Sequence, residues 1–265
     1  MKKLLSLTLA ALMAMTMLTG CSSEEEATGE LAEVQAAGVM NIGYTVYEPM
    51  NYEDESGVLT GFDTEFAQAV CEKLGVEPNF IIINWDTKVV ELDSKNIDAI
   101  WNGMTITDEL QANISTSNPY VKNAQVVVIN TANADKYTDT ASLVDATIVA
   151  ESGSAGELAI YDDADLSTAE YIPLAKQTDA LLEVKSGAAD AAVFDWTLAK
   201  SVIGEGTDFA DLMMIEGVSL SEENYGIGFR KDSDLKDAID EIMVELIEDG
   251  TLPALAEKYG LGLAE

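Results

Sequence analysis

The sequence predicts an α/β fold with two sheet-and-helix units, and three observations lead to this prediction. Runs of β-favouring residues alternate with helical patterns, the alternation starts again near residue 147, and one strand and one helix remain at the C-terminus. Such alternation is typical of parallel sheets covered by helices. A lone C-terminal strand and helix need a sheet to join, and the first unit is a candidate host.

The first unit is expected to begin with a short buried strand from Met40 to Tyr44. Asp63 is a candidate N-cap for a helix whose apolar residues recur at helical spacing until Gly75 ends it. Further strands are expected at 80–83, 99–101 and 126–129, with a helical stretch around 89–92.

The second unit repeats this order. Strands are expected at 147–150, 169–172 and 191–194, with one helix starting at Ser154 and another over 178–185 that Gly187 closes. The last segment is a strand from Tyr225 to Phe229 and a helix whose apolar stripe runs from Leu235 to Ile247.

The first 21 residues have the pattern of an export signal. Lys2 and Lys3 precede an apolar run from Leu4 to Leu18, and Thr19-Gly20-Cys21 follows. The run is too short to span a bilayer and ends in small residues, as in secretory signals. A buried helix is the alternative, but it would need a polar face that this run lacks. The cysteine resembles the lipobox cysteine of bacterial lipoproteins, which implies removal of residues 1–20 and lipidation of Cys21.

Residues 21–30 are acidic, small or polar, so they cannot bury enough apolar surface to fold and are expected to form a linker. Order should begin near Leu31. The protein would then be an extracytoplasmic body, anchored to the membrane at the cell surface or in the periplasm, and touching that membrane only through the lipid on Cys21.

Composition excludes several classes of partner. Removing two of the 14 basic residues with the signal leaves 12 against 48 acidic ones, a formal charge of −36. Nucleic acid and anionic headgroups repel such a body, although most of this charge serves solubility. The chain has no histidine, the commonest general base and metal ligand, so we expect no metal and no cofactor. Cys71 is then the one remaining cysteine, a core residue with no disulfide partner, and we expect a monomer.

Six short motifs resemble, in order and spacing, the extracellular solute-binding proteins, type 3, of amino-acid ABC importers, over nearly the whole body. They are Gly57-Val58-Leu59-Thr60-Gly61-Phe62-Asp63, Asp98-Ala99-Ile100 with Gly103-Met104-Thr105-Ile106-Thr107, Ser117-Asn118-Pro119-Tyr120, Glu151-Ser152-Gly153-Ser154, Asp190-Ala191-Ala192-Val193-Phe194-Asp195 and Tyr225-Gly226-Ile227-Gly228-Phe229-Arg230-Lys231.

The resemblance implies a two-lobe periplasmic-binding-protein fold of type II, in which two crossing strands join two mostly parallel sheets flanked by helices. Lobe 1 would comprise 31–126 and 223–265, and lobe 2 would comprise 127–222, with crossings at 126–130 and 217–223. A ligand that touches both lobes stabilises the closed form, which an ABC permease and its ATPase could recognise.

Asp195 ends a predicted strand, where ligands lie in open α/β sheets, and it matches the family's ammonium-binding aspartate. The alternative is an aspartate that caps the next helix. Ser154-Ala155-Gly156-Glu157 has a capping-box pattern, so a helix starts there with amides that can hold a carboxylate. The alternative is an ordinary cap without a ligand.

The resemblance also implies a strip of ligand contacts after the strand at 99–101. This strip comprises Asn102, Gly103, Met104 and Thr105. Tyr47 matches a stacking aromatic, and Trp101 is a candidate second wall, with the core as the alternative for both. Trp85 and Tyr120 are assigned to the core.

One position departs from the family. Typical members have a carboxylate-binding arginine where this chain has Leu110, and Arg230 is expected outside the cleft. Either Ser154 and Thr105 hold the carboxylate, Lys122 takes part, or the ligand lacks a carboxylate there, since an unpaired buried carboxylate costs several kcal/mol. With Asp195 and Glu151 in the cleft, a cationic amine is an alternative ligand, with Tyr44, Tyr47, Trp101 and Trp196 as candidate cage walls.

The sequence thus predicts a binding protein rather than an enzyme. Two alternatives remain: an enzyme of the same fold, such as a cyclohexadienyl dehydratase, and a sensory binding lipoprotein. The lack of histidine and of cleft arginines stands against the dehydratase.

Overall fold

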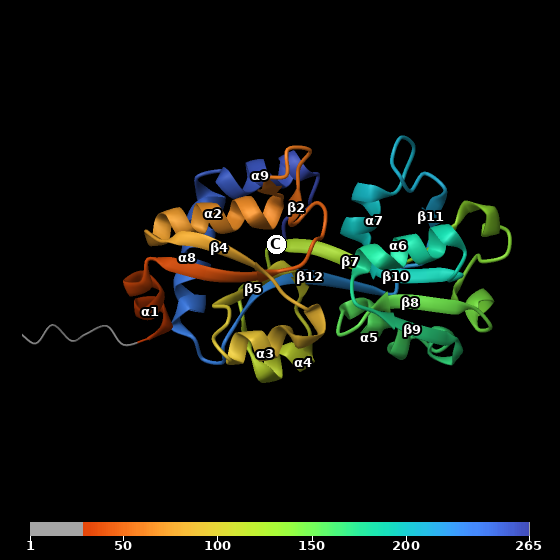
Figure 1. The fold of residues 1–265 in the computed structure, drawn as a ribbon, viewed down its shortest axis with the longest axis horizontal. Coiled ribbons are helices and arrows are strands. Elements are labelled where there is room, and N and C mark those ends of the chain that lie inside the picture. Colours follow the sequence, from red (N-terminus) through yellow and green to blue (C-terminus); the bar gives the residue numbers. More distant parts are fainter. Residues whose placement is uncertain (1–28, 265) are drawn as a thin grey trace, which may run out of the picture.

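A computed structural model describes residues 29–264, which form two lobes side by side (Figure 1). The predicted signal at 1–20, the lipidation of Cys21 and most of the predicted linker lie outside the described residues. Among residues 29–264, no helix has the length and apolar character that crossing a membrane requires.

Lobe 1 contains the first predicted unit and the C-terminal segment. Its sheet places β4 (Glu77–Ile82), β1 (Val39–Tyr44) and β5 (Ala99–Thr105) in parallel, and β12 (Ser221–Phe229) runs antiparallel to β5. The C-terminal strand therefore joins the first sheet, as the sequence predicted. The lobe's other elements are α1 (Glu30–Ala37), β2 (Tyr52–Glu53), β3 (Leu59–Thr60), α2 (Phe62–Leu74), α3 (Lys88–Asp93), α4 (Asp108–Asn113), β6 (Ser115–Thr116), α8 (Asp234–Glu248) and α9 (Thr251–Tyr259).

Lobe 2 has the same design with fewer helices. Its parallel strands are β10 (Ala191–Asp195), β8 (Thr147–Glu151) and β9 (Glu170–Leu174), and β7 (Val121–Asn130) runs antiparallel to β10. Both lobes are thus mostly parallel, which confirms the predicted fold class. The remaining elements are α5 (Ala155–Asp162), α6 (Gln177–Ser186), α7 (Trp196–Val202), β11 (Leu212–Met214) and 3-10 turns at 85–87, 131–133, 140–143 and 166–168.

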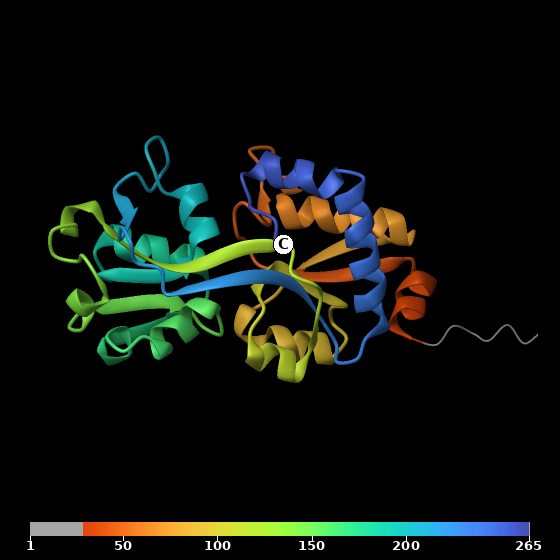
Figure 2. The same cartoon turned by 180° about the vertical axis from the view of Figure 1, so that it is seen from behind.

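The two lobes are joined by β7 and β12, which run side by side from one lobe to the other (Figure 2). These strands pair with each other only over 121–125 and 221–225. Residues 126–130 instead pair with β10 and β11 inside lobe 2, so the predicted crossing at 126–130 is wrong. The second predicted crossing, 217–223, is right only in its last three residues. The crossing was predicted at 126–130 because the apolar run at 126–129 has the pattern of a strand. The stretches that link the lobes, 121–125 and 221–225, are more polar.

One predicted helix cap is wrong, and two helix-end predictions are confirmed. Asp63 lies inside the first turn of α2, which Gly61 precedes, and its Oδ2 accepts hydrogen bonds from the Gly103 amide (2.6 Å) and the Tyr120 hydroxyl (3.0 Å). Ser154 caps α5 through its hydroxyl, and Gly187 ends α6 with a φ of 76°. Asp63 therefore does not cap the helix but fixes the backbone at Gly103, near the end of β5.

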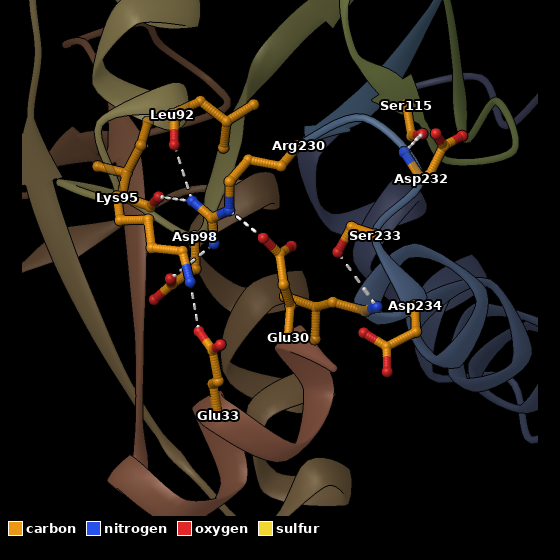
Figure 3. Close-up of polar contacts among 12 residues, drawn as sticks. Glu30, Glu33, Leu92, Lys95, Asp98, Ser115, Arg230, Asp232, Ser233 and Asp234 are labelled. Carbon is orange, nitrogen blue, oxygen red and sulfur yellow. Dashed lines mark hydrogen bonds and ion pairs between the residues drawn. The ribbon is translucent and has the colours of Figure 1, made fainter. Parts of the chain in front are cut away.

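Arg230, at the end of β12, lies outside the cleft and binds three parts of lobe 1 together (Figure 3). Its guanidinium donates to the carbonyls of Leu92 (2.8 Å) and Ile97 (2.6 Å) and to the carboxylate of Asp98 (3.1 Å). It also pairs with Glu30 of α1. The Arg230 side chain is only 11% exposed, so its ion pair with Glu30 is shielded from water. This ion pair attaches α1 to the sheet of lobe 1.

Candidate functional site

A hollow of about 320 Å³ lies between the lobes. Lobe 1 contributes the turn before α3, the end of β5 and α4, and lobe 2 contributes the start of α5. Its lining includes Trp85, Lys88, Met104, Thr105 and Leu110 from lobe 1, and Gly153, Ser154 and Ala155 from lobe 2. A larger hollow of about 850 Å³ runs along β7, β12 and the segment after β11. It contains no lobe 1 residue outside the two linking strands. A further hollow of about 460 Å³ also lies between α4 and α5, but it includes no residue of β5, so the 320 Å³ hollow is the candidate site.

Asp195 is the centre of a buried polar network that is linked to the wall of this hollow through Glu223 and Thr105. The carboxylate is 5% exposed, and its Oδ1 accepts hydrogen bonds from Asn123 (2.5 Å), Gln125 (2.9 Å) and the Tyr225 hydroxyl (2.8 Å). Its Oδ2 accepts one from Gln177 at 2.6 Å. Burial, and then the nearby charge of Glu223, raise the pKa of Asp195 despite these donors.

Glu223, which sequence reasoning missed, links the network to the wall of the hollow. Its Oε1 accepts from the Thr105 hydroxyl (2.7 Å) and from the same amides of Asn123 (2.6 Å) and Gln125 (2.7 Å) that bind Asp195. Two carboxylates therefore share two donors, and Thr105 belongs to both the wall and the network. Asn123 and Gln125 alternate along β7, and Asn123 lies opposite Glu223 in β12. Polar residues at alternate positions of a strand lie on one face, so this pattern could have identified Asn123 and Gln125 as site residues.

Glu151, which ends β8, is a second fully buried carboxyl group beside Asp195, whereas Glu223 is partly exposed. Burial chiefly, and then the charge of Asp195, raise its pKa to about 8, although the positive charge of Lys88 acts in the opposite direction. Its Oε1 has no hydrogen-bond partner among the described residues, and the same holds for the buried Oε1 atoms of Gln125 and Gln177. The network therefore has an excess of acceptors, which suits a group rich in N–H donors, such as an ammonium.

The start of α5 presents backbone donors to the hollow. The Ser154 hydroxyl accepts from the Glu157 amide (3.2 Å), and the Glu157 carboxylate accepts from the Gly153 amide (2.8 Å). The predicted capping box is thus present in altered form, with the glutamate reaching one residue further back. Amides in the first turn of a helix have no acceptor within that helix, so this end favours negative charge.

Only half of the predicted strip lines the hollow. Met104 and Thr105 do, whereas Asn102 binds Thr45 and Asn51 within lobe 1. Gly103 has a φ of 54°, and a Cβ there would lie 2.7 Å from the ring of Tyr47. Glycine is therefore required at this position for close packing.

The aromatic predictions need correction. Trp101 is fully buried and packs edge-on against Phe66, with ring centroids 4.9 Å apart, because β5 is covered on both faces. Trp85 lies in the core of lobe 1, as predicted, and it also borders the hollow. Tyr47 is buried, with its hydroxyl against that of Tyr225, so it contacts the network rather than the hollow. The remaining aromatics lie elsewhere: Tyr120 in the core, Tyr44 against Phe80 and Trp196 in the larger hollow.

Two lobes, two linking strands and a polar hollow between the lobes define a protein that binds a small solute by enclosing it. Residues 40–262 match the family described as bacterial extracellular solute-binding proteins, family 3, and the chain belongs to that family.

Relatives with known names bind amino acids. The chain is 28% identical over 257 residues to the L-cystine-binding protein TcyJ of Escherichia coli, covering 95% of this chain and 94% of the relative. A mutant of ArgBP from T. maritima superposes with a TM-score of 0.79 at 32% identity, over 86% of this chain and 98% of that one. Another structure of ArgBP has arginine bound.

A further similar structure is that of a binding protein described as the precursor of an enzyme. It is the ancestral amino acid-binding protein AncCDT-1, a precursor of cyclohexadienyl dehydratase, with a TM-score of 0.78 at 28% identity over 87% of this chain and 99% of that one. It is itself described as a binding protein.

Proposed function

We propose that this protein captures an amino acid that carries a net positive charge in the hollow between its lobes and delivers it to an ABC permease and its ATPase. The observation that carries the proposal is the convergence of Asp195, Glu151 and Glu223, with three buried acceptor atoms that have no partner among the described residues. The family and the amino-acid-binding relatives support the same class of ligand.

The α-ammonium of the ligand is assigned to Asp195. A positive group there favours the ionised forms of Asp195 and Glu151, which burial disfavours without a ligand. An ammonium has three N–H donors. It replaces the hydrogen bonds that the side-chain amides of Gln177, Asn123 and Gln125 make to Asp195 without a ligand.

Binding is coupled to closure because both lobes contribute contacts. The lobes touch through Lys88 Nζ and the Gly153 carbonyl (2.7 Å), Ser201 Oγ and Glu48 (3.2 Å), and Lys200 Nζ and the Gly260 carbonyl (3.2 Å). Two of these three contacts are part-buried and one is exposed. A ligand that bridges the lobes adds to them and so shifts the equilibrium toward closure.

We propose that the ligand leaves unchanged, with no chemistry in the cleft. The chain has no histidine to act as a general base, and Leu110 replaces the one cleft arginine that the family resemblance implies. Incubation of the purified protein with prephenate or arogenate should leave both compounds intact, and turnover of either would support an enzyme of the same fold.

We propose that the body is held outside the cytoplasmic membrane by a lipid on Cys21, as the motif Leu18-Thr19-Gly20-Cys21 suggests. Mass spectrometry of the mature N-terminus should find a diacylglyceryl cysteine. Cys21→Ala should release the protein from the membrane fraction, and its retention there would contradict the anchor.

The test of the binding function is a thermal-shift panel of amino acids, quaternary amines and polyamines. A ligand at 100 times its dissociation constant adds about 2.7 kcal/mol to the stability of the folded state. L-Arginine or another cationic amino acid should raise the melting temperature. A panel in which only neutral amino acids do so would contradict the proposed charge preference.

A further inference from the structure

We infer that Lys88 binds the carboxylate of the ligand in place of the arginine that Leu110 replaces, so that the cleft selects an amino acid over the corresponding amine. This inference rests on the proposed function, and it assigns a specificity-determining role to one side chain. Lys88 and Leu110 line the same hollow.

Lys88 is held across the cleft by neutral groups. It is the first residue of α3, its side chain is 6% exposed, and its Nζ lies 4.8 Å from the centroid of the Trp85 ring. The Nζ donates to the Trp85 carbonyl (3.2 Å) in lobe 1 and to the Gly153 carbonyl (2.7 Å) in lobe 2. An ammonium has three N–H donors, so one donor remains for an acceptor within the hollow.

Lys88 is buried, and no described residue supplies it with a directly bonded counter-ion. Within residues 29–264 no carboxylate lies at ion-pair distance from its Nζ, although most other lysines have such a partner or are exposed. Desolvation lowers its pKa, and the carboxylates of Glu151, Asp86, Glu109 and Glu157 oppose this effect from beyond ion-pair distance, Glu151 most strongly. A buried cation without a bonded counter-ion is costly, and a ligand carboxylate would supply that counter-ion.

The position of Lys88 also completes a two-sided carboxylate site. Gly153, which Lys88 contacts, directly precedes Ser154, the N-cap of α5. A carboxylate beside Lys88 therefore lies next to the first-turn amides of α5, which favour negative charge. Lys122, the alternative raised by the sequence, is exposed on β7 and lines the larger hollow instead.

The hydrogen bonds of Lys88 to both lobes also fit an alternative role, in which Lys88 only holds the lobes together. Lys200 is a matched control for that role, because it also spans the lobes through a lysine–carbonyl hydrogen bond (3.2 Å, to Gly260) and lies 4.8 Å from a tryptophan ring, that of Trp196. Lys200 does not line the interlobe hollow. A role limited to closure predicts equal losses for all ligands, whereas a carboxylate contact predicts a loss confined to ligands that carry one.

The experiment is titration calorimetry of the purified protein and its Lys88→Met, Lys88→Arg and Lys200→Met variants with two pairs of probes. The pairs are L-arginine with agmatine and L-lysine with cadaverine, each a cationic amino acid and its decarboxylated amine. For the pair that binds, Lys88→Met should weaken the amino acid by roughly 10- to 100-fold and the amine by less than about threefold. Lys88→Arg should restore most of the preference, and Lys200→Met should leave the ratio unchanged.

Three results would overturn the inference: a wild-type protein that binds the amine as tightly as the amino acid, equal losses for both probes in Lys88→Met, or no loss for either. A wild-type protein that binds neither pair would instead contradict the proposed function, and the inference would fall with it. The two failures are therefore distinguishable by the behaviour of the unmodified protein.

Discussion

The replacement Asp195→Asn should separate ligand binding from folding. An asparagine side chain has the shape of the aspartate but no charge. Its oxygen can still accept from Asn123, Gln125 and Tyr225, which now bind Oδ1 of Asp195. On the other side, Gln177 donates to Oδ2, and its own Oε1 has no partner, so rotation of that amide by 180° would let it accept instead.

The size of the effect follows from these contacts. A hydrogen bond to a charged group contributes about 1.5 to 3 kcal/mol, so loss of the charge should weaken L-arginine binding by roughly 10- to 150-fold. Stability at neutral pH should stay the same or rise, because burial penalises the charge that is removed. Asp195→Ala should also weaken binding by at least about tenfold, but it should lower the melting temperature because it leaves several buried donors without an acceptor.

Titration calorimetry with L-arginine and thermal melts without ligand measure the two quantities. Asp237→Asn is the charge control, because Asp237 is 78% exposed on α8 and does not line the interlobe hollow. An unchanged dissociation constant in Asp195→Asn would refute the assignment of the ammonium. A collapse in melting temperature would refute the claim that the network tolerates the amide.

Four further predictions concern the missing arginine, the pH dependence of affinity, the pH dependence of stability, and Arg230. Leu110→Arg should tighten binding of a neutral amino acid such as L-serine by about tenfold in calorimetry, because it adds a second cation beside the start of α5, and weaker binding would show that the hollow cannot hold one. The affinity for L-arginine should rise between pH 6 and pH 8, because the ligand favours ionised Glu151, whose pKa is about 8 without the ligand. Calorimetry in two buffers of different ionisation enthalpy measures the protons that binding releases. An affinity that does not change with pH would contradict this prediction. Over the range from about 4.5 to about 8 the folded form without ligand binds more protons at Glu151 than the unfolded chain, so its melting temperature should fall as pH rises. Arg230→Met should destabilise the protein by about 3 to 5 kcal/mol because it leaves Asp98 and Glu30 unpaired, and its dissociation constant for L-arginine should change by less than about threefold.

Most of the fold could be predicted because its strands are apolar runs and its helices have apolar faces. The strands at 147–150 and 191–194 lie within one residue of β8 and β10. The linking strands were misplaced because their paired stretch carries Asn123, Gln125 and Glu223, and polar residues weaken the pattern that identifies a buried strand.

The site was predicted where strand ends determine it and missed elsewhere. Asp195 ends β10, so the order of elements alone places it at the carboxyl edge of the sheet. Trp101 became a candidate wall of the cleft because the sequence does not show that β5 is buried on both faces. The sequence likewise does not show that Trp85, a core residue, also borders the hollow. Lys88 was missed because a lysine in an apolar helical stretch reads as exposed until the second lobe covers it.

The most direct test of the central claim is a crystal structure of the protein with L-arginine. We expect the ligand between the lobes, with its α-ammonium within about 3 Å of the Asp195 carboxylate and its carboxylate beside Lys88 and the first turn of α5. Arginine bound in the larger hollow along β7 and β12, or enclosed between the lobes with its ammonium away from Asp195, would contradict the account.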